Sequence, residues 1–186
     1  MNDRKVILYI ATSLDGFIAK DNNDISFLST VEVVGEDYGY SEFIKPIDIV
    51  IMGRKTYDKV LSFGVAFPHK DKKCYVLSQT RTGKDENVEF FNGDVGILIQ
   101  KIRKSDGLNI FIDGGSELIH ELMKQNLIDR FIISVIPHML GGGIKLFNPG
   151  RPELTLKLIR SSSFPSGLVQ LEYERGERLK QKAAYL

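Results

Sequence analysis

Ile47-Asp48-Ile49-Val50-Ile51-Met52-Gly53-Arg54-Lys55-Thr56 is the stretch that decides the fold class of this chain. A nearly continuous apolar run, typical of a buried strand, passes directly into a glycine, two basic residues and a threonine. Glycine lets the backbone approach a ligand closely, and the start of a helix offers free N–H donors and a positive dipole end. The stretch therefore predicts a strand that ends in a site for phosphate.

Two further strand ends repeat this arrangement later in the chain. Cys74-Tyr75-Val76-Leu77 is followed by Ser78-Gln79-Thr80-Arg81, and Asn109-Ile110-Phe111-Ile112-Asp113 is followed by Gly114-Gly115-Ser116 and a helical pattern. Hydroxyl and guanidinium groups complete an anion site. Taken singly, each motif also fits a helix start, a tight turn or a surface loop. Side by side in one sheet, the three ends predict a ligand with several phosphates, such as a dinucleotide.

Composition limits the classes of protein to which the chain can belong. Its 186 residues are enough for one domain with a substantial core, and the formal net charge of +1 gives no support for non-specific nucleic-acid binding. One cysteine, Cys74, excludes an internal disulfide and favours a reducing compartment. No apolar stretch approaches the roughly 18 residues that span a bilayer. We therefore expect a single domain, residues 1–186, in the cytoplasm, without a membrane or nucleic-acid partner.

The periodicity along the chain predicts a sheet with interspersed helices. Apolar residues have helical spacing around 37–45, 57–61, 95–102 and 118–123, and apolar strands are expected near 6–11, 108–113 and 131–136. Asp94 is placed to cap the third helix. Apolar and polar residues alternate over 154–158 and 169–173, which predicts a half-buried antiparallel pair. Residues 20–35 show no period, and the charged tail from Arg175 is expected to be loose.

Several familiar catalytic motifs are missing from the sequence. The stretch at 53–56 lacks the two-glycine spacing of a P-loop, and no G-x-G-x-x-G follows the first strand. There is no G-x-S-x-G, so nucleophilic catalysis has no support. His69, His120 and His138 have no metal-ligand spacing with each other or with Cys74. The sequence therefore predicts neither phosphoryl transfer, nor an activated serine, nor a metal site.

Asp37 is the candidate catalytic residue. It stands just before the first short helical stretch, where an aspartate commonly serves as an N-cap. The alternative is that its carboxyl faces the ligand and acts as a proton source or a substrate anchor. Asp15 precedes Gly16 and is expected to serve a turn. Glu42 is the remaining carboxylate that we weigh for a role in catalysis.

Two known families share motifs with this chain. Met52-Gly53-Arg54-Lys55-Thr56-Tyr57 resembles the cofactor motif of the dihydrofolate reductases. Ile112-Asp113-Gly114-Gly115-Ser116-Glu117-Leu118 and Ser13-Leu14-Asp15-Gly16 resemble the reductase domain of bacterial riboflavin biosynthesis. The two families form one structural superfamily, and the resemblance covers about residues 5–175. It implies an α/β, dihydrofolate reductase-like three-layer fold: a mixed sheet with a parallel centre and an antiparallel C-terminal pair, and helices on both faces.

The resemblance also implies NADPH as the cofactor and a homodimer as the assembly. Basic and hydroxyl side chains after the first two strand ends would meet the adenosine 2′-phosphate. Thr56 and the turn after the third strand would hold the pyrophosphate, and three apolar residues near the N-terminus would flank the nicotinamide. The implied cofactor-binding residues are Ala11, Ile18, Ala19, Gly53, Arg54, Lys55, Thr56, Leu77, Ser78, Arg81, Gly114, Gly115, Ser116 and Glu117.

The sequence differs from both families in segments that bind their substrates. The chain has no tryptophan, and residues 24–36 lack the Trp-x-Leu-Pro-like segment of a dihydrofolate reductase. Asp37 aligns with the active-site carboxylate of that family only if a gap is placed in the alignment. Phe17 stands where the riboflavin reductases often have a basic residue, and residues 36–43 replace their arginine-bearing stretch, which helps to hold a ribose phosphate. No deaminase domain accompanies the reductase motifs.

The sequence thus predicts an NADPH-dependent reductase that transfers a hydride to a C=N or C=O carbon of a small pteridine- or pyrimidine-like substrate. It is similar to the 5-amino-6-(5-phosphoribosylamino)uracil reductase of riboflavin biosynthesis. Three alternatives stay open: a dihydrofolate reductase proper, a non-catalytic NADP-binding module, and an α/β structural or interaction domain.

Overall fold

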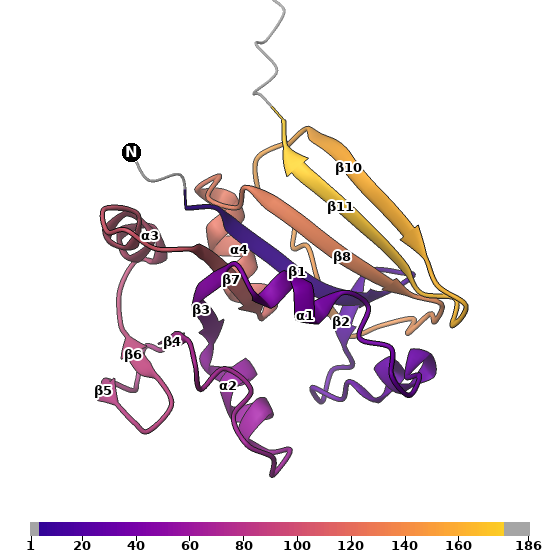
Figure 1. Ribbon diagram of the computed structural model, residues 1–186, viewed down its shortest axis with the longest axis horizontal. Coiled ribbons are helices and arrows are strands. Elements are labelled where there is room, and N and C mark those ends of the chain that lie inside the picture. Colours follow the sequence, from indigo (N-terminus) through magenta and orange to yellow (C-terminus); the bar gives the residue numbers. More distant parts are fainter. Residues whose placement is uncertain (1–3, 177–186) are drawn as a thin grey trace, which may run out of the picture.

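The computed structural model describes residues 4–176 and contains a nine-stranded sheet together with a two-stranded one. The strands of the large sheet are β1 (Val6–Ser13), β3 (Ile47–Gly53), β4 (Lys73–Leu77), β5 (Gly83–Lys84), β6 (Glu89–Phe91), β7 (Asn109–Gly114), β8 (Arg130–Ile136), β10 (Leu156–Ser163) and β11 (Val169–Arg175). They lie in the order β10-β11-β8-β1-β7-β3-β4-β6-β5. Figure 1 shows the β10–β11 hairpin at one edge of the sheet and the short β5–β6 hairpin at the other.

The centre of the sheet is parallel, as the sequence predicts. β1 pairs in parallel with β7 and β8, β3 pairs in parallel with β7 and β4, and β4 pairs in parallel with β6. β11 is antiparallel to both β8 and β10, which confirms the predicted C-terminal pair. The register places Gly53 opposite Leu77 and Met52 opposite Gly114. The carboxyl ends of β3, β4 and β7 therefore meet at one edge of the sheet.

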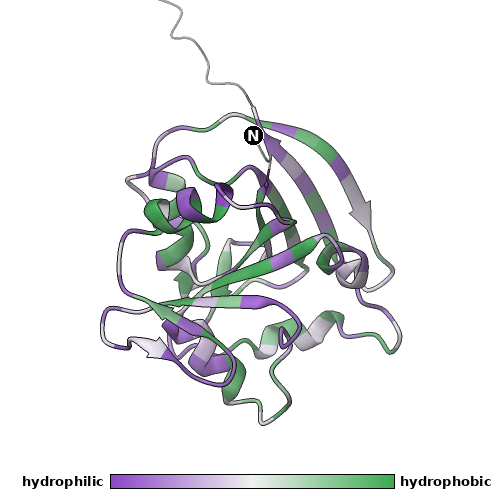
Figure 2. Ribbon diagram, turned by 60° about the vertical axis from the view of Figure 1, so that its left-hand side comes forward, coloured by the Kyte–Doolittle hydropathy of each residue, from purple (hydrophilic) through white to green (hydrophobic). Residues whose placement is uncertain are grey.

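Helices cover both faces of the sheet, so the predicted three-layer arrangement is confirmed. They are α1 (Tyr40–Ile44), α2 (Arg54–Leu61), α3 (Val95–Arg103) and α4 (Ser116–Lys124). One face packs against α1 and α2, and the opposite face packs against α3 and α4. Asp94 caps α3, because its carboxylate accepts a hydrogen bond from the Ile97 N–H. The central strands are largely apolar along their length (Figure 2), as expected for strands buried on two faces.

Part of the stretch that shows no period in the sequence is regular in the structure. A 3-10 helix, η1 (Ser26–Val31), buries Phe27 and Val31 against Ile136 and Leu168. Before it, β2 (Phe17–Ala19) pairs antiparallel with β9 (Ile144–Lys145) in the small sheet. Both elements lie over the carboxyl end of β1 and form one wall of the site described below.

The C-terminal hairpin differs from its predicted burial. Its apolar residues were expected to face the core, yet Leu158 is 52% exposed and Val169 is 37% exposed. The buried residues of β11 are instead the polar Gln170 and Glu172. Gln170 donates to the hydroxyls of Tyr9 and Ser134, and Glu172 pairs with Arg130 on β8. Buried polar groups are tolerated where such partners exist, and sequence alternation does not reveal these partners.

No helix within residues 4–176 is long and apolar enough to cross a membrane. Arg175, from which a loose tail was expected, is the last residue of β11, and its guanidinium contacts the Asp129 carboxylate at 2.8 Å. The rest of the predicted loose tail, from residue 177 onward, lies outside the described residues.

Candidate active site

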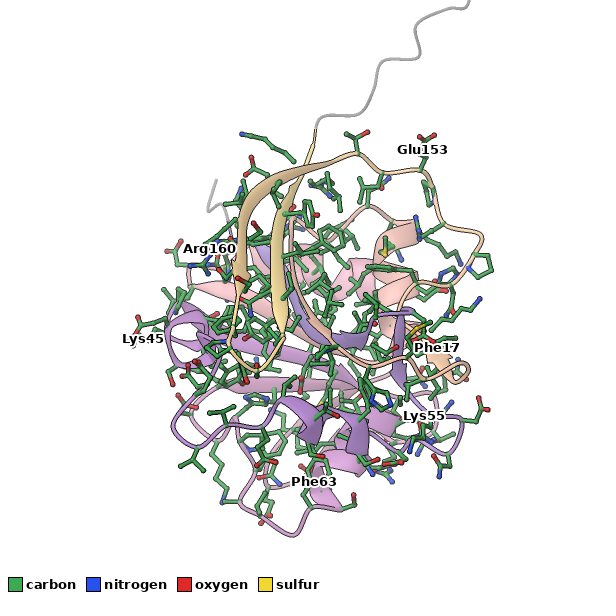
Figure 3. All side chains as sticks on the ribbon, turned by 90° about the vertical axis from the view of Figure 1, so that its right-hand side faces the viewer. Phe17, Lys45, Lys55, Phe63, Glu153 and Arg160 are labelled. Atoms are coloured by element: carbon green, nitrogen blue, oxygen red, sulfur yellow. The ribbon has the colours of Figure 1, made fainter. Side chains whose placement is uncertain are left out.

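A groove of about 1260 Å³ runs along the edge where β1, β3, β4 and β7 end. All of the predicted cofactor-binding residues line it except Arg81 and Gly114. They reach the groove from separate parts of the chain: the β1–β2 region, the β3–α2 junction, the end of β4 and the β7–α4 junction. In Figure 3, Lys55 from α2 and Phe17 from β2 lie on the same side of the molecule. The structure thus brings together residues that the sequence could only place at separate strand ends.

The glycines at the ends of β3 and β7 bring two backbones into close proximity. A Cβ atom on Gly53 would lie 3.6 Å from the Gly115 nitrogen, and one on Gly115 would lie 3.3 Å from the Thr56 Oγ1 atom. Gly114 has a φ of +100°, a conformation that favours glycine, and its peptide bond to Gly115 is cis. Because these positions carry no side chains, backbone amides of both strand ends are accessible from the groove.

Three helices begin at the groove, and two of them, α2 and α4, have no side-chain cap. The N-cap residue of α2 is Gly53 and that of α4 is Gly115, and neither helix start has a side-chain capping hydrogen bond. By contrast, α3 is capped by Asp94. The first N–H groups of α2 and α4 therefore have no side-chain acceptor and form two adjacent positive ends. This arrangement suits the phosphates of a ligand in the groove.

Asp58 joins the two arginines of the predicted phosphate site. Its carboxylate accepts hydrogen bonds from Arg54 at 2.6 Å and from Arg81 at 2.7 Å. Arg54 lines the groove and Arg81 does not. The shared contact with Asp58 nevertheless keeps Arg81 close to Arg54. Sequence reasoning missed Asp58, although its i,i+4 spacing from Arg54 was a usable signal. The two guanidinium groups form a preassembled pair whose shared counter-ion is a carboxylate.

The remaining polar residues of this part fix the loops around the groove. The Ser78 hydroxyl accepts hydrogen bonds from the N–H groups of Thr80 and Arg81, at 3.2 and 2.8 Å, and so shapes the loop after β4. Lys55 forms an ion pair with Glu117 at 2.9 Å, which links the first turns of α2 and α4. Both side chains of this pair are exposed, so a ligand phosphate can compete for Lys55 with little loss of stability.

The opposite end of the groove is apolar and is held in place by Asp15. Ala11, Ile18 and Ala19, the residues predicted to flank a nicotinamide, line this end, and that role stays a prediction. The Asp15 carboxylate accepts from the Ser13 hydroxyl at 2.6 Å and from the Gly141 N–H at 2.7 Å. These hydrogen bonds, the one from Ser13 foremost, lower the pKa of Asp15 to about 2. The residue therefore does more than serve its own turn, because it ties the β1–β2 turn to the loop before β9.

A second cavity, of about 410 Å³, adjoins the groove and shares Ala11 and Leu28 with it. Its walls include Tyr9, Tyr38 and Tyr40. Burial raises the pKa of both Tyr9 and Tyr40, so these phenols stay protonated near neutral pH. A flat ring bound here would lie next to the apolar end of the groove, which is where a hydride acceptor must lie relative to a nicotinamide.

Asp37 lines this second cavity and lies two residues before Gly39, the N-cap residue of α1. Its carboxylate accepts hydrogen bonds from the Gly39 and Ser41 N–H groups at 2.8 and 3.0 Å. Hydrogen bonds from Ser41 and Gly39 hold the pKa of this exposed carboxyl below its usual value. Asp37 is thus not the N-cap residue that the sequence suggested, although its carboxylate still accepts a hydrogen bond from the first turn of α1. The proton role of Asp37 stays a prediction, and a carboxyl with a lowered pKa holds no proton of its own at neutral pH.

Asp113 and His69 are polar residues of the site that the sequence did not assign. Asp113, the residue before the Gly114–Gly115 turn, lines the groove, and its carboxylate lies 3.5 Å from the Nε2 atom of buried His69. The His69 ring packs edge-on against Phe67 and Phe111. The position of Asp113 in its motif was a sequence signal, whereas nothing in the sequence links His69 to the groove.

The sheet topology and the glycine-lined groove define a dihydrofolate reductase-like fold. Dihydrofolate reductase from Enterococcus faecalis, solved in complex with NADP(H), superimposes with a TM-score of 0.63 over 93% of this chain and 97% of that one, at 16% identity. The profile of the RibD C-terminal domain matches residues 4–170. The chain belongs to the RibD C-terminal domain family, and the resemblance inferred from the motifs is confirmed.

Two relatives are similar over nearly their whole length. The uncharacterized protein YwjB of Bacillus subtilis (strain 168) is 43% identical over 174 residues, which cover 93% of this chain and 99% of YwjB. A protein of Shewanella sp. PV-4, provisionally assigned to riboflavin biosynthesis, has a crystal structure that matches with a TM-score of 0.86. That match has 32% identity and covers 93% of this chain and 99% of the Shewanella chain.

Proposed function

We propose that this protein is an NADPH-dependent reductase that transfers a hydride to a C=N or C=O carbon of a small pyrimidine- or pteridine-like ring. The observation that supports this most strongly is the pair of uncapped, glycine-started helices, α2 and α4, beside the Arg54–Asp58–Arg81 cluster. Two anion sites next to each other fit a pyrophosphate and a separate phosphate on one ligand. Membership of a reductase family supports the same activity.

Each part of the groove has a distinct role in this proposal. The amides at the starts of α2 and α4, with Thr56 and Ser116, bind the pyrophosphate. Arg54 and Lys55 bind the 2′-phosphate. The wall of Ala11, Ile18 and Ala19 excludes water from the nicotinamide face. When bound, NADPH supplies the hydride, and the chain supplies position and electrostatics.

The substrate ring binds in the second cavity, between the tyrosines and the apolar end of the groove. Reduction of a C=N or C=O bond also needs a proton at the neighbouring heteroatom. Because the pKa of Asp37 is lowered, we propose that its carboxylate orients a water molecule that delivers this proton, rather than delivering one itself. Asp113, which lines the groove rather than the second cavity, is the alternative carboxylate for this role.

The test separates an enzyme from a binding module with the same fold. Purified protein is first assayed for stabilisation by NADPH, and then for NADPH oxidation with a panel of oxidised pyrimidines and pteridines, dihydrofolate included. Oxidation that depends on one ring class, and that is lost in Gly115→Val, supports a reductase. Stabilisation without oxidation of any candidate supports the non-catalytic module. A homodimer and a cytoplasmic location stay predictions.

A further inference from the structure

The second cavity is lined by charges of one sign. Three carboxylates, Glu32, Glu36 and Asp37, are among its lining residues. No lysine, arginine or histidine lines it anywhere within residues 4–176. The 2′-phosphate end of the groove is the reverse, because Arg54, Lys55 and Lys59 line it. The site therefore carries cations at the cofactor end and only anions where the substrate is expected.

Within residues 4–176, no cation forms an ion pair with any of the three carboxylates. Glu36 accepts a hydrogen bond from the Tyr38 N–H at 2.8 Å, and Asp37 accepts from two backbone amides. Glu32 makes no side-chain hydrogen bond or ion pair to any residue that the structure describes. Backbone amides carry no formal charge, so these hydrogen bonds bring no counter-ion to the cavity. Arg160, which acts electrostatically on Tyr9, is already paired with Glu172 at 3.5 Å.

The floor of the cavity suits a flat ring with polar edges. Tyr9, Tyr38 and Tyr40 contribute aromatic faces. Polar atoms also reach the floor, since the Tyr9 hydroxyl donates to the Tyr38 carbonyl at 3.2 Å and Ser134 lies beside it with its hydroxyl bonded to Gln170. Aromatic walls with a few placed polar groups are typical of heterocycle sites.

We propose that the substrate of this site is a flat, amine-bearing heterocycle that carries no phosphate group. The inference rests on the proposed function and specifies its substrate class. A phosphate dianion would face three unneutralised carboxylates without a guanidinium or ammonium partner, which opposes its binding. Ring amines and N–H groups, in contrast, donate hydrogen bonds to carboxylates. The cavity therefore discriminates against a ribose 5-phosphate substituent.

A matched pair of probes tests this directly. The protein is saturated with NADPH, as verified by its own thermal shift, and is then titrated with 5-amino-6-(5-phosphoribosylamino)uracil and with the same compound lacking the phosphate. We expect the dephosphorylated compound to bind at least about tenfold more tightly. Raising the salt concentration should narrow this difference, because screening weakens repulsion but not steric exclusion.

A second experiment reverses the charge of one residue that lines the cavity. Glu32→Lys should shift the affinity ratio at least about threefold toward the phosphorylated probe. Glu153→Lys is the matched control, because Glu153 lines neither cavity and lies on the side of the molecule away from Lys45, which follows α1 (Figure 3). The control should leave the ratio unchanged.

The outcomes separate this proposal from the function on which it rests. Absence of an NADPH shift counts against the reductase itself. With a normal NADPH shift, equal or tighter binding of the phosphorylated probe overturns the inference, as does a ratio insensitive to Glu32→Lys. Binding of neither probe overturns the assignment of this cavity to an aminated heterocycle.

Discussion

Arg54 is the single side chain on which the predicted preference for NADPH most depends. It lines the groove, is 38% exposed and pairs with Asp58, so its removal deletes little packing. A charge-assisted contact to phosphate contributes about 1.5–3 kcal/mol. Arg54→Ala should therefore weaken NADPH binding about tenfold or more, with an unchanged circular dichroism spectrum and unchanged NADH affinity. Lys101→Ala, on the exposed side of α3, is the control, and an Arg54→Ala variant that titrates like it would assign Arg54 to the solvated surface.

Asp37 tests whether a carboxylate that accepts from backbone N–H groups at the start of α1 also serves the reaction. The side-chain oxygen of asparagine can accept such hydrogen bonds too, so Asp37→Asn should keep the melting temperature and NADPH affinity. If the carboxylate orients the proton-delivering water, turnover should fall at least about tenfold. The measurement is steady-state turnover with a substrate from the panel. Wild-type turnover in Asp37→Asn would leave this residue with a structural role alone and direct attention to Asp113 or Glu42.

Asp15 offers a prediction about pH. Its folded-state pKa of about 2 lies below the ordinary value of 3.8. A lowered pKa means that the carboxylate stabilises the fold above about pH 4 and loses this contribution as pH falls toward 2. Asp15→Asn should lower the melting temperature at neutral pH, and the gap to the wild type should close between about pH 4 and pH 2. A gap that stays constant down to pH 2 would show that the charge of Asp15 does not stabilise the two loops.

At the scale of elements, the two glycines of the β7–α4 turn are expected to have different roles, Gly114 in the stability of the fold and Gly115 in cofactor binding. Gly114 has φ +100°, where any side chain is strained, whereas Gly115 has φ −83°. A side chain at Gly115 instead meets Thr56 and extends into the groove. Gly114→Ala should lower the melting temperature, while Gly115→Val should abolish the NADPH-induced shift with a smaller loss of stability. Normal NADPH binding by Gly115→Val would remove this turn from the site.

How far the sequence predicts an element depends on whether its pattern is local. β3, β4 and β7 could be predicted because an apolar run and the glycine or hydroxyl after it lie within a few residues of each other. η1 could not, since the cluster that buries Phe27 and Val31 includes Ile136 and Leu168, far along the chain. The exposed face of β10 and β11 was predicted wrongly for the same reason: Gln170 and Glu172 are buried by partners on β1 and β8.

The candidate site shows the same limit. The residues of the groove could be located because each belongs to a short motif at a strand end. The contacts between these motifs could not be predicted. Asp58 binds Arg81 only because the loop after β4 lies beside α2. His69 contacts Asp113 only because the segment before β4 lies next to the end of β7. Glu32, Glu36 and Asp37 likewise lie in one short segment between η1 and α1, but nothing in that segment predicts that all three line a cavity with Tyr9 and Ser134.

At the scale of the whole molecule, the proposed cofactor groove, with its uncapped helix starts and its arginine pair, leads through an apolar wall to an acidic cavity. A thermal-shift titration with NADPH and NADH tests this arrangement most directly. At about 100 times its Kd, NADPH should stabilise the fold by roughly 2.7 kcal/mol, a rise of roughly 5–11 °C for a chain of this size. NADH, which lacks the phosphate that Arg54 and Lys55 would bind, should give a much smaller shift at the same concentration. Equal shifts from the two cofactors, or no shift from either, would contradict the account.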